Sequence, residues 1–250
     1  MTALEAIAIA AAGVGAGAIN TVVGSGTLLT FPVLLGFGYA PVVANVSNTV
    51  GLVAGGVSGT HAYRAELGGQ RRRAVALGAA STLGGIAGAV LLLALPGSAF
   101  KAIVPFFIGC ALVLVVFQPR LASRLEARRA KLGEHGVWWT LPALFGTGLY
   151  GGYFGAAQGI LLLAVLGLSL TETLQRVNAL KNVLGTLTNA VAALVFVVFA
   201  HVDWRIASLI AVGSILGGQI GARLARHLPP TALRGVIVAV GIAAIVKLAL

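Results

Sequence analysis

Most of the chain consists of apolar segments close to 20 residues long, separated by short polar connections. A helix of about 20 apolar residues spans the hydrocarbon core of a bilayer, which is roughly 30 Å thick. Only 9% of the 250 residues are charged, so we expect an all-α, polytopic membrane protein. The expected segments are residues 4–23, 27–37, 41–63, 74–95, 100–117, 137–155, 159–168, 172–199, 205–226 and 232–250.

Two of these segments, 27–37 and 159–168, are too short to cross a bilayer as straight helices. At 1.5 Å per residue, a helix of about 11 residues is roughly 16 Å long, or about half of the hydrocarbon core. Each short segment follows a glycine-rich break: Gly24-Ser25-Gly26-Thr27 in the first half, and residues 151–159, which end in Gln158-Gly159, in the second. Paired breaks of this kind predict a transporter site near the bilayer midplane.

The two breaks belong to an internal duplication. Gly24 aligns with Gly155 and Val46-Ser47 with Val177-Asn178, both at an offset of 131, and Pro96 aligns with Pro229 at 133. We therefore expect a first membrane repeat over residues 1–117 and a second over residues 137–250. Residues 118–136 are expected to form a basic cytoplasmic loop, either as a plain linker or as an amphipathic surface helix.

The basic loops predict how the repeats are oriented. Residues 64–73 and 118–136 are rich in arginine and lie two crossings apart, so the positive-inside rule places both in the cytoplasm. Residues 201–204, the repeat partner of 64–73, contain no lysine or arginine. We therefore expect inverted-topology repeats, with five crossings per half if the short segments contribute spans, or three if they form re-entrant hairpins. The sequence leaves both alternatives open.

Composition excludes several other classes of protein. The net charge of +11 lies mostly in short loops between apolar segments, so we expect no nucleic-acid partner. A single cysteine, Cys110, excludes an internal disulfide. No His-Glu-x-x-His motif or metal-ligand cluster is present in the sequence, and we expect no cofactor and no metal.

The chain resembles the TauE/SafE sulfite exporter family in the order of several weak motifs. They are Gly24-Ser25-Gly26-Thr27-Leu28-Leu29-x-x-Pro32, Ala44-Asn45-Val46-Ser47-Asn48-Thr49, Val177-Asn178-x-x-x-Asn182, Val202-Asp203-Trp204 and Gly217-Gly218-x-x-Gly221-Ala222. The resemblance implies a secondary transporter that exports a small sulfur-containing anion, sulfite or an organosulfonate, across the bacterial inner membrane. Some relatives that import thiosulfate rely on cysteines, whereas this chain has only Cys110, outside both breaks.

An oxyanion near the midplane needs hydrogen-bond donors and positive charge. Short-helix N-termini supply free N–H groups, so we expect the site to include Gly24, Ser25, Gly26, Thr27, Gln158 and Gly159. The alternative is that these glycines only allow close helix crossing. The third segments carry further polar candidates, Asn48 in the first half and Asn178, Lys181 and Asn182 in the second, and Thr186 and Asn189 extend a stripe along the same helix.

Lys181 is the most informative of these candidates. A lysine well inside a membrane helix costs several kcal/mol unless it is paired or hydrated, and no acidic residue is an obvious partner. A bound anion is one solution, and extension of the side chain to the interface is the other. His61 is a candidate for proton coupling or a polar anchor. Ser169-x-x-Glu172 reads as a capping box, which makes Glu172 a helix cap rather than a proton carrier.

Three other functions are consistent with parts of the sequence. The first is uptake of another small anion, such as thiosulfate or a carboxylate. The second is an intramembrane hydrolase with Ser25 and His61 as nucleophile and base, but the duplication replaces them with Ala156 and Ala192. The third is a structural membrane scaffold, which would not need polar groups inside its helices.

Overall fold

The computed structural model describes residues 1–129, 139–224, 235, 238–239 and 242. Over this part the chain is helical and contains no strand. The helices are α1 (Ala3–Val22), α2 (Thr27–Gly36), α3 (Pro41–Ala62), α4 (Arg71–Ala94), α5 (Gly97–Arg129), α6 (Thr140–Tyr153), α7 (Gln158–Ser169), α8 (Leu174–Phe199) and α9 (Trp204–Leu224).

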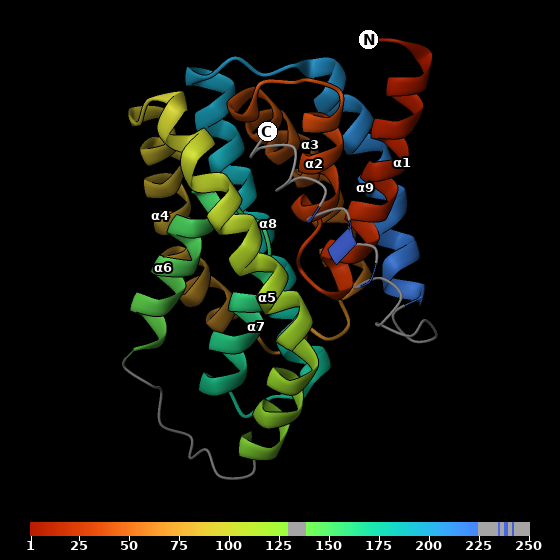
Figure 1. Cartoon of the computed structure of the whole chain (residues 1–250). Coiled ribbons are helices and arrows are strands. Elements are labelled where there is room, and N and C mark those ends of the chain that lie inside the picture. The colour runs from red at the N-terminus through yellow and green to blue at the C-terminus, as the bar shows by residue number, and fades with distance from the viewer. Residues whose placement is uncertain (130–138, 225–234, 236–237, 240–241, 243–250) are drawn as a thin grey trace.

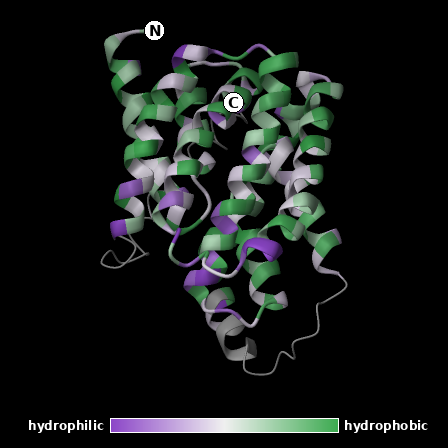
Figure 2. Cartoon of the chain, turned by 180° about the vertical axis from the view of Figure 1, so that it is seen from behind, coloured by the Kyte–Doolittle hydropathy of each residue, from purple (hydrophilic) through white to green (hydrophobic). Residues whose placement is uncertain are grey.

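Six of these helices, α1, α3, α4, α5, α8 and α9, are long and apolar enough to cross a membrane. Large apolar side chains such as Val90, Phe106 and Phe199 are exposed on their outer faces, as expected for contact with lipid. Figure 2 shows hydrophobic residues along the helices, with hydrophilic residues mainly at the top edge and in the lower part. The chain is therefore an all-helical, multi-pass membrane protein.

The long helices pack in two groups through glycine. In the first group α9 packs against α1 and α3, and in the second α4 packs against α6 and α8 (Figure 1). A Cβ atom on Gly17 of α1 would overlap the backbone of Ser214, and one on Gly88 of α4 would overlap the backbone of Leu149. Glycine at these positions lets the helix backbones touch, as is common in membrane bundles.

Within each group the helices run in the same direction, because the residue numbers of the contacts rise together. Gly13 and Gly17 lie against Ile210 and Ser214, and Gly84 and Gly88 lie against Phe145 and Leu149. By the expected repeat offset, α1 corresponds to α6 and α9 to α4, so the two groups have the pairings that a duplication predicts. The inverted duplication itself, and the second-repeat segment 232–250, which lies mostly outside the described residues, stay predictions.

Both short helices fold back along the helix that precedes them. Gly26, just before α2, lies against Ala16 and Asn20 of α1. In the second half, Thr140 at the start of α6 donates a hydrogen bond to the Ser169 hydroxyl at the end of α7, with an O···O distance of 2.9 Å. The short segments therefore form helical hairpins and do not continue across the molecule.

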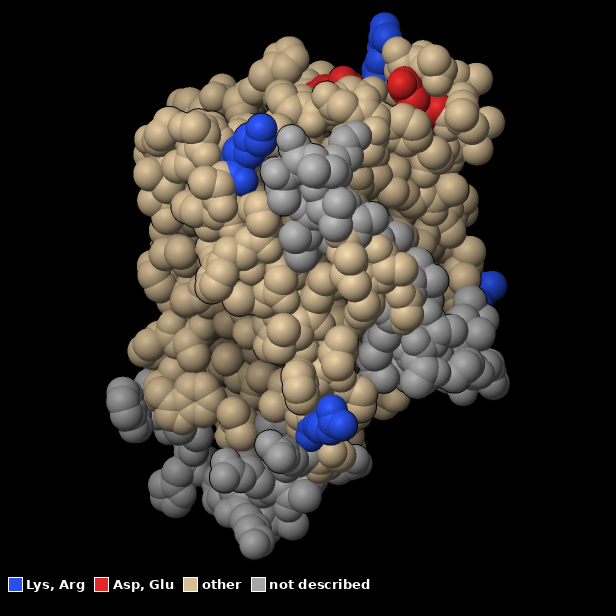
Figure 3. Space-filling model, in the orientation of Figure 1, with Lys and Arg blue, Asp and Glu red and all other residues tan. Residues whose placement is uncertain are grey.

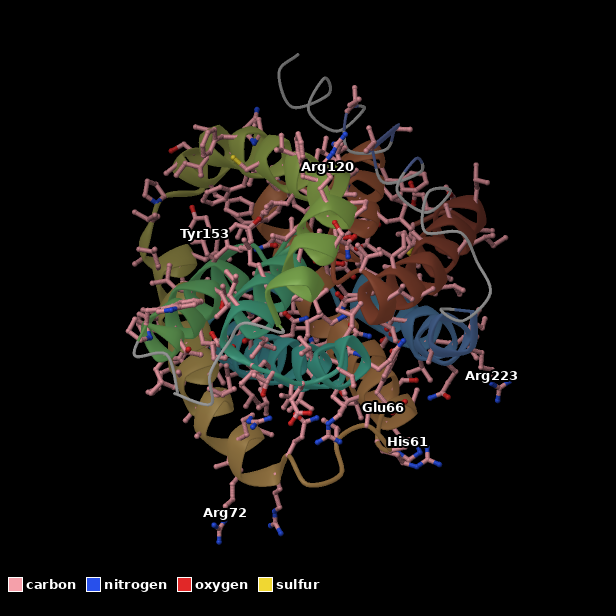
Figure 4. All side chains as sticks on the ribbon, turned by 90° about the horizontal axis from the view of Figure 1, so that it is seen from below. His61, Glu66, Arg72, Arg120, Tyr153 and Arg223 are labelled. Carbon is pink, nitrogen blue, oxygen red and sulfur yellow. The ribbon has the colours of Figure 1, made fainter. Side chains whose placement is uncertain are left out.

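Basic residues gather at one end of the molecule. This end, where α3 and α9 finish and α4 and α8 begin, carries Arg64, Arg71, Arg72, Arg73, Arg120, Arg176 and Arg223. Figure 4 looks at this end and shows Arg72 and Arg223 at its rim, while Figure 3 shows few charged side chains over the middle of the face it presents. The positive-inside rule predicts that this end is cytoplasmic.

The structure corrects one expected boundary. We expected a segment that ends at 117 and a loop over 118–136, but α5 continues to Arg129. Residues 118–129 contain leucine, alanine, arginine and glutamate, which favour helix, and the first glycine comes only at Gly133. The start of this stretch is thus a continuation of α5. Whether residues 118–136 form an amphipathic surface helix stays a prediction, and residues 130–138 lie outside the described part.

The predicted capping box at Ser169 and Glu172 is wrong. Helix α8 starts at Leu174, and its cap is Thr173, whose hydroxyl accepts a hydrogen bond from the Arg176 N–H at 3.3 Å. The Glu172 carboxylate instead accepts hydrogen bonds from Arg73 at 2.8 Å and from Arg176 at 2.6 Å. Both arginines offer the carboxylate a full positive charge as well as a hydrogen bond, whereas a backbone N–H offers only a partial charge.

We predict that Glu172→Gln destabilises the protein by about 1 kcal/mol at neutral pH. The hydrogen bond from Arg73, with a second from Arg176, holds the pKa of the Glu172 carboxyl below its usual value despite burial. A depressed pKa means that the stabilisation is present above the ordinary carboxyl pKa and is lost as the pH falls through the folded-state pKa. Thermal unfolding in detergent at neutral and acidic pH should show the two proteins converging in acid. Identical unfolding temperatures at neutral pH would contradict this prediction.

Candidate functional site

The two glycine-rich breaks touch each other in the middle of the structure. The Gly159 N–H donates a hydrogen bond to the Gly24 carbonyl, with an N···O distance of 2.9 Å. A Cβ atom on either glycine would overlap the backbone of the other. Gly24 also has a φ of +85°, a conformation that favours glycine. The Gly159 N–H therefore donates to the protein itself, although the sequence predicted that it would be free to bind a ligand.

Donors from α8 satisfy the end of α1. The Lys181 Nζ donates to the carbonyls of Asn20 at 3.0 Å and Thr21 at 3.1 Å. The side-chain amides of Asn178 and Asn182 each donate to the Thr21 carbonyl at 3.4 Å. The last carbonyls of a helix lack partners within the helix, and a cation beside them also offsets the negative end of the helix dipole.

The Lys181 side chain is 2% exposed, so it does not extend to the interface. The ion pairs in the described part of the chain involve Glu5 and Glu172, and neither acid contacts Lys181. An ammonium group has three donors, and the two α1 carbonyls use two of them. One N–H of the Lys181 ammonium group therefore remains unused beside the breaks. Its positive charge has no carboxylate partner within the described part of the chain.

A small cavity opens at this position. It is bounded by the end of α1, both breaks, α3 and α8. The centre of a water-sized sphere can move through about 30 Å³ of it, and one water needs about 10–15 Å³ by this measure, so it has room for a few waters. Its lining consists of Asn20, Thr21, Gly24, Thr27, Gly56, Gly59, Gly155, Gln158, Gly159, Lys181, Asn182, Gly185, Thr186 and Asn189.

Six of the expected site residues line this cavity, and the others lie around it. The six are Gly24, Thr27, Gln158, Gly159, Lys181 and Asn182. Gln158 is 4% exposed, and its side-chain nitrogen has no hydrogen-bond partner among the described residues. This nitrogen is a second donor that is left for a bound species.

The remaining expected residues support the cavity from outside its lining. The Asn48 side chain donates to the Thr27 hydroxyl at 3.3 Å and also pairs with Thr30. Asn178 binds the end of α1, as described above. Ser25 is buried, and its hydroxyl has no partner within the described part of the chain, whereas Gly26 packs on α1. None of the four belongs to the cavity lining.

His61 lies apart from these residues. It is exposed at the end of α3, and Figure 4 shows it at the periphery of the basic end of the molecule. It is not among the residues that line the cavity. Proton coupling through His61 stays a prediction that no contact with the cavity supports.

Part of the lining is not among the residues expected from the sequence, including Asn20, Thr21, Gly56 and Gly59. Asn20 and Thr21 directly precede the first break, so their carbonyls could have been recognised as the unpaired end of a helix. Gly56 and Gly59 are three residues apart on α3, where helical spacing places them on one face. Gly56 lies against the Thr186 side chain, whose hydroxyl is 3.2 Å from that of Thr60.

An aromatic cluster holds the second break against the first half. Phe154, at the start of the break, makes an edge-to-face contact with Phe31 of α2, with ring centroids 5.1 Å apart. Phe100 of α5 packs on Phe154 as well, at 5.9 Å. The Asn45 side chain donates to the Tyr153 carbonyl at 3.0 Å. These contacts fix the backbone that forms one wall of the cavity.

We predict that Gly24→Ala destabilises the protein far more than Gly38→Ala. Both glycines have a φ near +85°, so both variants bear a backbone cost of about 1–2 kcal/mol. A Cβ at Gly38 meets open space, whereas one at Gly24 overlaps the Gly159 backbone. Thermal unfolding in detergent measures the difference. Equal losses in the two variants would show that the contact between the breaks does not hold the structure together.

Comparison with known proteins agrees with this architecture. The chain is 27% identical over 231 residues to the probable membrane transporter protein YfcA of Escherichia coli (strain K12), an alignment that covers 90% of this chain and 82% of that protein. It is 26% identical to a probable membrane transporter protein of Haemophilus influenzae, covering 88% of this chain and 85% of the relative.

A third relative is the probable membrane transporter protein ORF9 of a Sinorhizobium species, at 26% identity over 93% of this chain and 88% of that protein. No solved structure gives a significant match. The family model described as sulfite exporter TauE/SafE matches residues 9–248, which is nearly the whole sequence. The chain is therefore a membrane transporter that belongs to the sulfite exporter TauE/SafE family.

Proposed function

We propose that this transporter carries a small sulfur-containing anion, sulfite or an organosulfonate, through the cavity where the two breaks meet. The observation that carries the proposal is Lys181, a buried cation that lines the cavity and has carbonyl partners but no carboxylate partner among the described residues. An unpaired charge inside a membrane protein is costly, and a bound anion would reduce that cost.

The chemistry of the cavity suits a small oxyanion. Lys181 supplies the positive charge, and the Gln158 and Asn182 side chains supply neutral donors. Bare backbone at Gly56, Gly59 and Gly185 lets the anion approach the helices closely. The room for only a few waters favours a compact anion over a bulky one.

We propose export as the direction because the family resemblance implies it, and a bacterial inner membrane as the location. Uptake of thiosulfate or a carboxylate is the alternative. Cys110 is exposed on α5 and does not line the cavity, so it provides no support for a path that depends on cysteines. Transport assays with the gradient imposed in either direction distinguish export from uptake.

We predict that Lys181→Gln lowers the catalytic efficiency of anion transport by at least about tenfold, since a hydrogen bond to a charged group contributes roughly 1.5–3 kcal/mol. The measurement is saturable sulfite or methanesulfonate flux in proteoliposomes. Arg176→Gln is the matched control, because it removes the same charge from the same helix five residues away, outside the cavity lining.

Because Lys181 also caps α1, thermal unfolding of both variants must accompany the flux measurement. Loss of flux in a folded Lys181→Gln protein, with flux retained in Arg176→Gln, is the expected result. Unchanged flux in Lys181→Gln would remove Lys181 from the site and overturn the proposal.

A further inference from the structure

Within the described part of the chain, the lining of the cavity carries a single formal charge. Of the fourteen residues that line it, Lys181 alone is ionisable, and the others are glycines or carry neutral amide and hydroxyl groups. The charge that this lining presents to a ligand is therefore at most +1. It is smaller in effect, because Lys181 already contacts the carbonyl end of α1, which carries about half a negative charge.

Other charged groups on the surrounding helices lie away from the cavity. His61 and Arg64 are exposed at or just beyond the end of α3, Arg223 is near the end of α9, and Arg73 and Arg176 are paired with Glu172. Glu5 is at the opposite end of α1. Helices α2, α6 and α7 contain no charged residue. Exposed charges at the ends of helices are screened by water and salt, so they add little to the potential in the cavity.

Because the lining carries at most one positive charge, the net charge of the occupied site depends on whether the bound anion carries one negative charge or two. A singly charged anion beside Lys181 gives a nearly neutral site, whereas a dianion leaves at least one negative charge uncompensated in a buried environment. An uncompensated buried charge costs several kcal/mol, whereas the neutral amides stabilise either anion through hydrogen bonds. We infer that the site selects singly charged oxyanions, so that hydrogensulfite and short monosulfonates are the transported species and the sulfite and sulfate dianions are rejected.

The inference rests on the proposed function, and it can be tested with the unmodified full-length protein. Hydrogensulfite loses its proton near neutral pH, whereas methanesulfonate is a monoanion throughout the usual assay range. We would measure the KM for total sulfite and for methanesulfonate in proteoliposomes with the same pH on both sides, one unit below and one unit above the hydrogensulfite pKa. Liposomes without protein correct for passive leakage of sulfur dioxide.

The expected result is that the ratio of the KM for total sulfite to the KM for methanesulfonate rises about tenfold between the two pH values, following the fraction of hydrogensulfite. The ratio is the readout because a change of charge on the protein alters both KM values alike. Sulfate should inhibit methanesulfonate transport weakly. A KM ratio that does not change with pH, including a parallel rise of both KM values, or strong inhibition by sulfate, would overturn the inference.

Failure of the proposed function gives a different result from failure of this inference. If neither anion shows saturable flux through folded protein, the assignment to sulfur oxyanions is wrong, and the charge selection derived from it is withdrawn as well. If both anions are transported but sulfite transport shows no preference for the monoanion, the proposed function stands and only the charge selection fails.

Discussion

The rest of this structure depends on how the carbonyl groups at the end of α1 are satisfied. Helix α1 stops inside the protein at the first break, so its last carbonyls face protein instead of bulk water. Lys181, Asn178 and Asn182 of α8 donate to them, and the Gly24 carbonyl just beyond takes the Gly159 N–H. Broken backbone at membrane depth is tolerated only with such partners. These hydrogen bonds therefore hold α8 and the second break against the first.

The same hydrogen bonds determine what Lys181 offers to a ligand. Carbonyl dipoles stabilise the ammonium enough for it to be buried, but they do not neutralise it as a carboxylate would. The cluster at Glu172 shows the contrast, because there a carboxylate pairs directly with Arg73 and Arg176 and links the starts of α4 and α8. A cation held by dipoles remains available to an anion, whereas an arginine paired with glutamate is already occupied. Helix capping and the proposed anion binding thus depend on one side chain.

The local sequence predicted most of the helices and named six residues that line the cavity. It failed where contacts between residues far apart in the sequence determine the structure. Apolar length and glycine spacing located the long apolar helices and both short helices, because these features depend on local hydropathy and helical period. They left open whether Lys181 is buried or extends to the interface, and only the structure shows that it is buried. The capping box at Glu172 failed because Arg73, about 100 residues away in the sequence, competes for the carboxylate. The contact between Gly24 and Gly159 could not be predicted either, since no local pattern specifies which glycines meet.

The expected duplication adds a constraint on the charge of the site. At the offset that aligns Val46-Ser47 with Val177-Asn178, Lys181 corresponds to Val50 of α3, so the charge occurs in one half only. Helix pairing needs the same small residues in both halves, and glycine faces occur in both. A site that repeated the lysine would present two cations and suit a dianion. One lysine shared between two otherwise similar halves suits an anion with a single charge, which is why the asymmetry of the sequence and the charge of the cavity lead to the same class of substrate.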